Sequence, residues 1–525
     1  MPSAPAWDVE PDQLEPATVA PEEVVEALTA VLGSDTFSTA PRCRDFLAYI
    51  VTEHLAGRAD RLGEHAVARH ALGRSEYDAR LSSTVRVQAT RLRTALQRYY
   101  EAEGRGSAIR ICLPTGRYAP TITRRDPPRE PSPAHDTLAV AVLRFGCTGS
   151  GAELIGTALC DAIAHRLGEF PGLTVTGPAA VAPEGAVAAR LLGARFVLEG
   201  MVTTTEDTVG LEATLTEVSS GEITWRVTKR LARAALAGSR LDDRWAAAVA
   251  GQVGDATGVT FRRALACDDH DGSVVYAARL AYTDYLMKQT ADSVSAAAAA
   301  LDTALATGRR AELLAMRGAI HNAEVNQGAT SGQRERELSS AETLAREALA
   351  LDPANASAYL VLGGTAWQRR EWDLAHRHAA RAVELAPWSP TVLMSAGTVM
   401  AVAGDWDGGV RTLREGFRLN PLHPGSAHAV AALACLISGD DAGALAEASL
   451  VQAPGQLWGP LYRALALAAL GFSDQAWTEM AQVLEIDPTF LDDPASYFTS
   501  RARFDTAELD RLLNHFEPFG AGPPL

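Results

Sequence analysis

The sequence predicts a multidomain α+β protein with three folded parts. Three observations lead to this fold class. A basic amphipathic helix precedes an alternating hairpin pattern before residue 123, strand and helix patterns alternate between 138 and 232, and helix signals recur every 34 residues in the second half of the chain. The 525 residues leave room for three or four domains, each large enough to have its own core.

The basic helix is predicted from the stretch STVRVQATRLRTALQRYY, residues 83–100, which holds four arginines and no acid. On a projection of 100° per residue its apolar side chains share a stripe about 80° wide, which we expect to face a core. A solvated helix usually mixes charges, because opposite charges at i, i+4 stabilise it. We therefore expect the other face to meet an anion. The stripe comprises Val85, Ala89, Leu92, Leu96 and Tyr99. The opposite face comprises Arg86, Thr90, Arg91, Arg93, Thr94, Gln97 and Arg98.

Charge is distributed unevenly along the chain. Residues 41–125 hold 16 arginines, no lysine and 8 acids, a local net charge of +8, within a protein of net charge −16. The remainder therefore carries −24. This asymmetry predicts a polyanion-binding region confined to the N-terminal part. Arginine identity says little by itself, because 46 of the 48 basic residues in the chain are arginine.

The N-terminal region, residues 21–122, is expected to follow a disordered start at 1–20. Helical patterns begin near Glu22 and cover 44–57 and 63–73, and they precede the basic helix. The stretch AIRICLPTGRYAPTIT at 108–123 alternates apolar and polar residues around PTG, which predicts a hairpin. Helices, a basic helix and then a hairpin are the order of a winged helix-turn-helix, in which the last helix enters the major groove of DNA.

The stretches VRVQATRLRTALQRYY and IRICLPTGRYAP resemble the recognition helix and wing of OmpR/PhoB-type response regulators. Residues 37–122 are also similar to an N-terminal module of bacterial multidomain proteins that carry TolB-like and tetratricopeptide parts. The resemblance implies a DNA-binding winged helix. Base readout is then expected from Arg86, Thr90, Arg93 and Gln97, and phosphate contact from Arg91, Arg98 and Arg117.

A purely structural role for the arginine helix stays open. Arg86 and Arg93 could pair with Asp78 or Glu101 within the same module. A second alternative is that the helix docks onto the acidic repeats of the same protein.

The Pro- and charge-rich stretch at 123–137 is typical of a linker. Residues 138–232 then show an apolar strand pattern, a helix pattern at 152–170, a short helix pattern near 185–192, and further strands. The order of these elements, with VLEG and the tail SGEITW, is similar to the TolB N-terminal-like domain. This resemblance implies a central α/β TolB-like domain, and residues 233–271 are expected to form connecting helices.

The sequence of the C-terminal region, residues 272–525, predicts that it forms an all-α tetratricopeptide solenoid. LDP, LAP, LNP and IDP begin at 351, 385, 419 and 486, with spacings of 34, 34 and 67 residues. Thirty-four residues is the tetratricopeptide period, and the proline would follow the second helix of each pair. Small residues such as Gly363 and Ala375 are expected where paired helices cross. A concave face for a protein or peptide partner follows from such stacking.

Few patterns point to catalysis, so we expect a non-enzyme without cofactor or metal. The turn FGCTGSGAEL at 145–154 lacks the Gly-Lys-Ser/Thr of a phosphate-binding loop, and we interpret it as a strand-to-helix turn that requires positive φ. The run CDDHD at 267–271 cannot close a metal site without partners elsewhere. His376 and His378 lie two residues apart on a helix and are expected to be solvated.

Composition predicts a cytoplasmic protein. The longest apolar run is too short for a membrane span, the N-terminal segment lacks signal-peptide features, and the six cysteines are scattered without a C-x-x-C pair. These features exclude membrane and disulfide-framework classes.

The leading hypothesis is a one-component transcriptional regulator that binds double-stranded DNA, with the TolB-like and repeat regions sensing a signal or recruiting a partner. A homodimer is expected, because a single winged module contacts few base pairs. The alternatives are a tetratricopeptide adaptor or scaffold without DNA binding, and a nucleotide-dependent enzyme centred on Gly146–Gly151.

Overall fold

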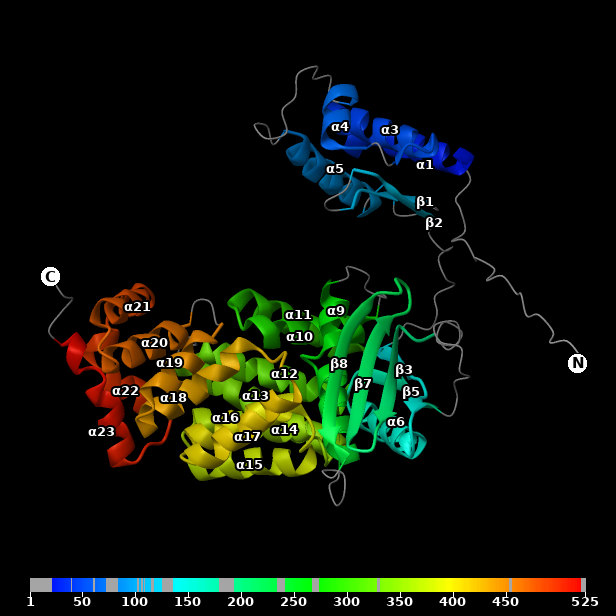
Figure 1. The fold of residues 1–525 in the computed structure, drawn as a ribbon. Helices are drawn as coiled ribbons and strands as arrows, with labels where there is room; N and C mark the ends of the chain where they lie inside the picture. The colour runs from blue at the N-terminus through cyan, green and yellow to red at the C-terminus, as the bar shows by residue number, and fades with distance from the viewer. Residues whose placement is uncertain are drawn as a thin grey trace, which may run out of the picture. The chain divides into compact units, whose positions relative to one another are not determined.

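The computed structural model of the protein describes residues 21–38, 40–59, 62–71, 84–101, 103–104, 107, 109–114, 118–124, 136–178, 193–233, 241–266, 273–327, 331–452 and 456–520. The chain forms two compact units, Met1–Pro133 and Ala134–Leu525. In coarse terms the protein is mixed α/β, with a central sheet and a helical C-terminal region (Figure 1). The predicted start at 1–20 and the middle of the linker lie outside the described residues.

The first unit consists of helices followed by a two-stranded hairpin. The β-strands pair antiparallel, from Ile109 opposite Arg124 to Cys112 opposite Thr121. The helices and the hairpin predicted from the sequence are therefore confirmed, with shorter strands than the alternation suggested. The elements are α1 (Pro21–Gly33), α2 (Asp35–Ser38), α3 (Pro41–Leu55), α4 (Glu64–His70), α5 (Thr84–Glu101), β1 (Ile109–Cys112) and β2 (Thr121–Arg124).

The predicted apolar stripe of α5 forms part of the core of this unit. Every member is at most 4% exposed, and Val85 and Leu92 are completely buried. The stripe packs with Phe46 and Leu47 of α3 and with Ile111 of β1. Because side chains of helices and hairpin share one apolar cluster, the orientation of α5 about its axis is fixed by burial.

The second unit contains a mixed sheet with the strand order β5-β3-β6-β7-β8, and β4 also pairs with β6. β3 runs parallel to β5 and β6, whereas β6, β7 and β8 are antiparallel neighbours. The elements are β3 (Leu138–Val142), β4 (Gly146–Thr148), α6 (Ala152–Gly168), β5 (Leu173–Thr176), β6 (Phe196–Thr204), β7 (Thr208–Glu217) and β8 (Ile223–Ala232). The predicted helix near 185–192 lies outside the described residues.

The segment expected to connect sheet and repeats is integrated into the core of the sheet. It forms α8 (Leu241–Gly254) and α9 (Val259–Ala266), and α8 packs against α6. Trp245, Val253 and Phe261 belong to the same apolar cluster as the buried strand residues. The sheet and the helices that follow it are therefore continuous in packing.

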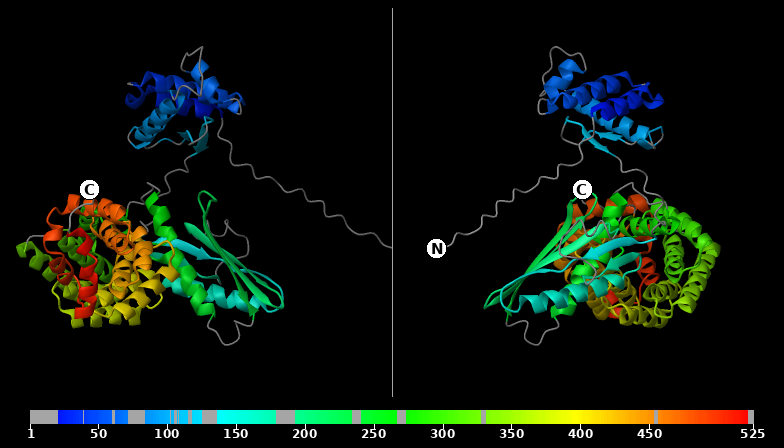
Figure 2. Two further views of the ribbon diagram at one scale, coloured as in Figure 1. Left: turned by 60° about the vertical axis from the view of Figure 1, so that its left-hand side comes forward. Right: turned by 90° about the vertical axis from the view of Figure 1, so that its right-hand side faces the viewer.

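The rest of the unit is a curved array of paired helices, which Figure 2 shows from two sides. Most helices of the array pack against the next helix along the chain. The helices are α10 (Val274–Lys288), α11 (Ala291–Thr307), α12 (Ala311–Asn326), α13 (Ser331–Leu351), α14 (Ala356–Gln368), α15 (Trp372–Leu385), α16 (Pro390–Val402), α17 (Trp406–Leu419), α18 (His428–Ser438), α19 (Asp441–Ser449), α20 (Trp458–Ala469), α21 (Ser473–Ile486), α22 (Pro494–Thr499) and α23 (Thr506–Asn514), with short 3₁₀ turns η4 (Gly425–Ala427), η5 (Phe490–Asp492) and η6 (Glu517–Phe519).

The ends of these helices follow the period seen in the sequence. Helices α13, α15, α17 and α21 end at Leu351, Leu385, Leu419 and Ile486, the first residue of each LDP-type motif. The turns inside the pairs repeat at a similar spacing. In the four pairs from α14 to α21 the turn is closed by a residue with left-handed backbone, a conformation that favours glycine. These residues are Arg370 (φ 60°), Gly404 (φ 107°), Gly439 (φ 81°) and Gly471 (φ 85°).

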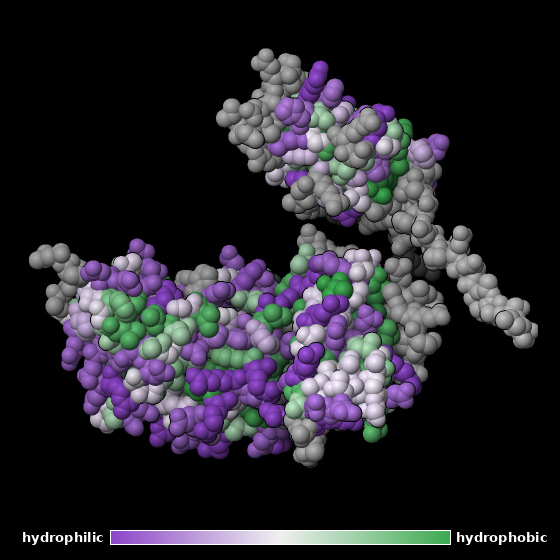
Figure 3. Space-filling view, viewed as in Figure 1, coloured by the Kyte–Doolittle hydropathy of each residue, from purple (hydrophilic) through white to green (hydrophobic). Residues whose placement is uncertain are grey.

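No helix in the described part of the chain is long and apolar enough to cross a membrane. In the view of Figure 3 the face of the array is mostly hydrophilic, with an apolar patch at the end that carries α20 and α21. Leu470, Phe472 and Ile486 are exposed in this part of the array.

Candidate nucleic-acid interface

The outward face of α5 follows directly from burial of its opposite side. Val87 is 43% exposed, and Thr90, Arg91, Thr94 and Arg98 are exposed with it. These five positions span about 100° of the helical projection. Of the described side chains on the predicted polar face, Thr90, Arg91, Thr94 and Arg98 are exposed as predicted, whereas Arg93 is half-buried.

Arg91 and Arg98 are the basic groups on this face. They lie seven residues apart, so they project from nearly the same direction about 10 Å apart along the axis. Neither makes an ion pair or hydrogen bond within the described part of the chain. Two nearby acids of the unit are engaged elsewhere: Glu53 accepts from Arg58 (Nη2 to Oε1, 2.6 Å), and Glu103 accepts from Thr36. Two guanidinium groups thus remain available to an external anion.

The positive charge of Arg91 also acts on a buried thiol of the first unit. Burial raises the pKa of the Cys43 thiol, and the nearby positive charge of Arg91 opposes that shift. Cys43 is 5% exposed and belongs to the core. The thiol therefore stays protonated and serves packing, and we assign it no reactivity.

Arg93 does not belong to the exposed face, and its predicted role as a base reader is not supported by its contacts. Its Nε donates to the carbonyl of Leu113 (2.8 Å), and its Nη2 donates to the carbonyl of Pro114 (2.9 Å). The guanidinium fork is therefore bound to the chain directly after β1. Arg93 does act structurally, as the alternative interpretation held, but it binds backbone carbonyls instead of acids.

Tyr100 makes a second connection between α5 and the hairpin. The backbone N–H of Ile111 donates to the Tyr100 hydroxyl at 2.8 Å, and the Arg110 guanidinium lies 5.4 Å from the centre of the ring. Burial raises the pKa of Tyr100 to about 12, so the hydroxyl remains neutral. With the Arg93 contacts, this bond fixes the position of the hairpin against the last three turns of α5.

Three predicted DNA-contacting residues are not placed by these observations. Arg86 and Gln97 lie on α5, but their side chains are outside the described residues, and Arg117 is outside them altogether. Helix α5 ends at Glu101, so the helix includes one acid beyond the acid-free stretch. Arg110 on β1 was not nominated from the sequence. Its place beside Tyr100 depends on the pairing of β1, which the sequence does not show. The alternating pattern of the strand, with Arg110 at an outward position, was the only sequence signal for this residue.

The glycine-rich turn before α6 is a strand-to-helix turn, as interpreted. Gly149 and Gly151 adopt φ of 98° and 77°. A side chain on Gly149 would collide with the backbone of Thr204, and the carbonyl of Ser150 accepts from Thr204 Oγ1 at 3.0 Å. The turn is thus closed by protein groups.

The two histidines of α15 are less solvated than predicted. His376 Nε2 lies 3.2 Å from Asp405 Oδ2, and the half-buried ring of His378 lies 6.1 Å from the Tyr359 ring. Burial lowers the pKa of His378. The motif CDDHD at 267–271 lies outside the described residues.

The chain matches no protein-family model, and no curated protein matches its sequence.

Proposed function

We propose that the chain is a cytoplasmic DNA-binding transcriptional regulator whose residues 21–122 act as a winged helix-turn-helix. The observation that carries the proposal is the outward face of α5. It presents Arg91 and Arg98 without partners in the described part of the chain, while Arg93 and Tyr100 hold the hairpin beside the same helix. A helix with a rigid basic face and an adjacent hairpin suits a DNA duplex.

In this proposal the exposed arginines supply affinity, because each guanidinium that neutralises a phosphate releases condensed counterions. Thr90, with Arg86 and Gln97 at neighbouring positions of α5, would meet base edges. Arg93 would set the angle between helix and wing and would touch no base.

The second unit would supply the regulatory input. We propose a TolB-like domain at 138–232 and tetratricopeptide repeats at 272–525, which would bind a protein or peptide partner. The helix ends at 351, 385 and 419 are spaced by 34 residues, and the left-handed turns recur every 32 to 35 residues, which supports the second assignment. Dimerisation would double the number of base pairs contacted.

The test is to separate the two units. Residues 1–133 and 134–525 would be produced independently, because the chain divides at this point, and titrated against fluorescent duplex DNA. We expect the first fragment to bind with steep salt dependence and the second to show no affinity. If the 1–133 fragment is folded but does not bind DNA, while the full chain does, then the assignment of DNA binding to the first unit is wrong.

An adaptor without DNA binding is the second candidate. The exposed Leu470 and Phe472, which lie two residues apart at the turn between α20 and α21, favour it, because neighbouring exposed apolar residues mark interaction surfaces. Genome-wide crosslinking distinguishes the two functions. Sharp DNA peaks support the regulator, and their absence together with stable protein partners supports the adaptor.

A further inference from the structure

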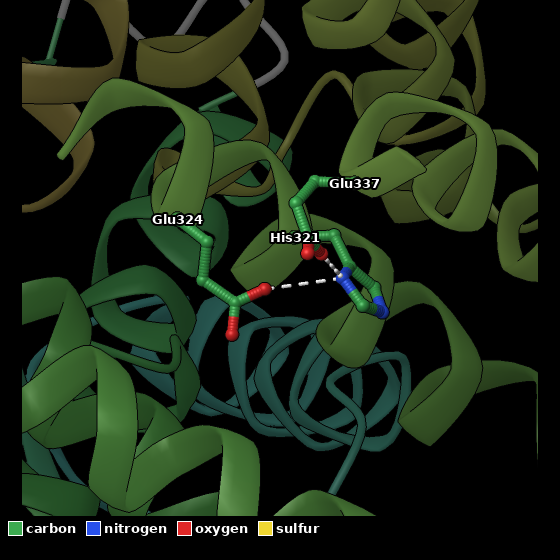
Figure 4. Close-up of side chains that lie close together, drawn as sticks. All are labelled: His321, Glu324 and Glu337. Atoms are coloured by element: carbon green, nitrogen blue, oxygen red, sulfur yellow. Dashed lines mark hydrogen bonds and ion pairs between the residues drawn. The ribbon is translucent and has the colours of Figure 1, made fainter. Parts of the chain in front are cut away.

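Three metal-ligating side chains converge between α12 and α13 (Figure 4). His321 Nδ1 lies 2.6 Å from Glu337 Oε2 and 3.1 Å from Glu324 Oε2. His321 and Glu324 are three residues apart on α12, so they share one face, and Glu337 comes from α13. The three side chains are 14%, 29% and 30% exposed for His321, Glu324 and Glu337. They are thus partly desolvated but remain accessible from solvent.

The charges around this group do not balance. Asp302 is linked to Glu324 through Arg317, whose Nε lies 2.8 Å from Asp302 Oδ1 and whose Nη1 lies 3.4 Å from Glu324 Oε2. Three carboxylates and one guanidinium leave a net charge of −2 around the imidazole of His321. A divalent cation bound by His321, Glu324 and Glu337 would offset this charge.

We propose that His321, Glu324 and Glu337 bind a divalent first-row transition-metal ion. One imidazole nitrogen with two carboxylate oxygens suits Zn²⁺ and its neighbours, whereas Mg²⁺ and Ca²⁺ prefer oxygen ligands alone. Three protein ligands leave a fourth position for water. This site lies in the helical array and does not depend on the proposed DNA-binding function.

The local geometry needs only side-chain adjustment to accept the ion. With ligands about 2.1 Å from one metal at tetrahedral angles, the Nδ1–Oε2 distance to Glu337 widens from 2.6 Å to roughly 3.4 Å. The metal takes the lone pair of Nδ1, so the ring proton moves to Nε2. Figure 4 shows Nε2 pointing away from both carboxylates. His321 also lines a cavity of about 570 Å³ with Ser339 and Thr343.

The test measures Zn²⁺ binding by the full chain after dialysis against a chelator. Isothermal titration would compare wild type with Glu337→Gln, which keeps the shape of the side chain and a hydrogen-bond acceptor but removes the anionic ligand. Asp441→Asn is the matched control. It removes a carboxylate that also contacts a histidine, at 2.8 Å from His515 Nε2. Among the described residues, however, no third metal-ligating side chain joins this pair.

We expect wild type and Asp441→Asn to share one binding event that Glu337→Gln weakens more than about tenfold, because even outer-shell changes cost that much. Zn²⁺ should also raise the melting temperature of wild type and Asp441→Asn, but not that of Glu337→Gln. If Glu337→Gln fails to fold, Glu324→Gln takes its place. Equal Zn²⁺ stoichiometry and affinity in wild type and a folded glutamine variant would overturn the proposal, as would no Zn²⁺ binding by wild type.

Discussion

Two arginines of the helical array and two arginines of α5 differ in the groups that surround them. In the array, Arg369 contacts Glu342 (Nη1 to Oε2, 2.8 Å) and Glu335 (Nη2 to Oε1, 2.6 Å), and Arg279 meets Glu312 at 2.6 Å. On α5, Arg91 and Arg98 have no such acid in the described part of the chain. Arg279 and Arg369 therefore connect helices of the array, whereas Arg91 and Arg98 remain available to an external anion.

The contrast also runs within α5 itself. Arg93, two residues from Arg91, is bound to two carbonyls. One helix thus carries a structural arginine and exposed arginines side by side. Their roles follow from the direction in which each projects, and mutations should separate them.

The largest expected effect is on the core beneath the basic face. Leu92→Ala removes a completely buried side chain and should destabilise the first unit by about 2–5 kcal/mol, a large fraction of the stability of a small domain. Chemical denaturation of the 1–133 fragment would measure the loss. In the full chain the second unit should unfold at its original denaturant concentration, and a shift there would mean that the two units are not independent.

Arg93→Ala should have the second-largest effect on the stability of the first unit. It removes two charge-assisted hydrogen bonds to Leu113 and Pro114, with an expected loss of about 1.5–3 kcal/mol in the stability of the first unit. Arg91→Ala, on the same helix, should leave stability within about 0.5 kcal/mol of wild type. Equal stabilities of the two variants would show that the Arg93 contacts do not fix the hairpin.

Two glycines of the array test its packing. A β-carbon on Gly397 would lie 2.6 Å from the carbonyl oxygen of Gly409 and from the backbone nitrogen of Leu413, so Gly397→Ala should destabilise the second unit by about 1–3 kcal/mol. Gly363→Ala is the control, because its new β-carbon would lie 3.4 Å from the nearest atom, the Ala375 carbonyl oxygen. Thermal unfolding should rank Gly397→Ala well below Gly363→Ala, and the opposite order would contradict the helix packing described for α14–α17.

The smallest expected effect is a gain in the stability of the second unit. Arg370 holds the left-handed conformation that Gly404, Gly439 and Gly471 hold in the other turns, and its side chain is exposed. Arg370→Gly should therefore stabilise the second unit by at most about 1 kcal/mol, since left-handed backbone strains a residue with a β-carbon. A measurable loss of stability in urea titration would mean that the Arg370 side chain holds the turn by contacts of its own.

The sequence was sufficient to predict those parts of the fold that are determined by local periodicity. The stripe from Val85 to Tyr99 and the helix ends at Leu351, Leu385 and Leu419 follow from spacing alone, because burial and helix breaking act over a few residues. The sequence left a structural role for Arg93 open, but its carbonyl partners could not be predicted, since they lie 20 and 21 residues away across a turn.

The cluster around His321 escaped sequence analysis for the same reason. A histidine and a glutamate three residues apart are common on surface helices, and only helix pairing adds Glu337 from 16 residues away. The packing of α8 and α9 into the core of the sheet was missed as well, because amphipathic helices do not specify which surface they cover.

The most direct test is the salt dependence of DNA binding by the 1–133 fragment carrying Arg91→Ala and Arg98→Ala. Arg58→Ala is the matched control, because the Arg58 guanidinium is already bound to Glu53. If the outward face of α5 meets phosphates, the double variant stays folded, binds every duplex more weakly, and loses about two units from the slope of log K against log salt. Arg58→Ala keeps the wild-type slope. A folded double variant with unchanged affinity and slope would contradict the assignment of α5 as the DNA-binding helix.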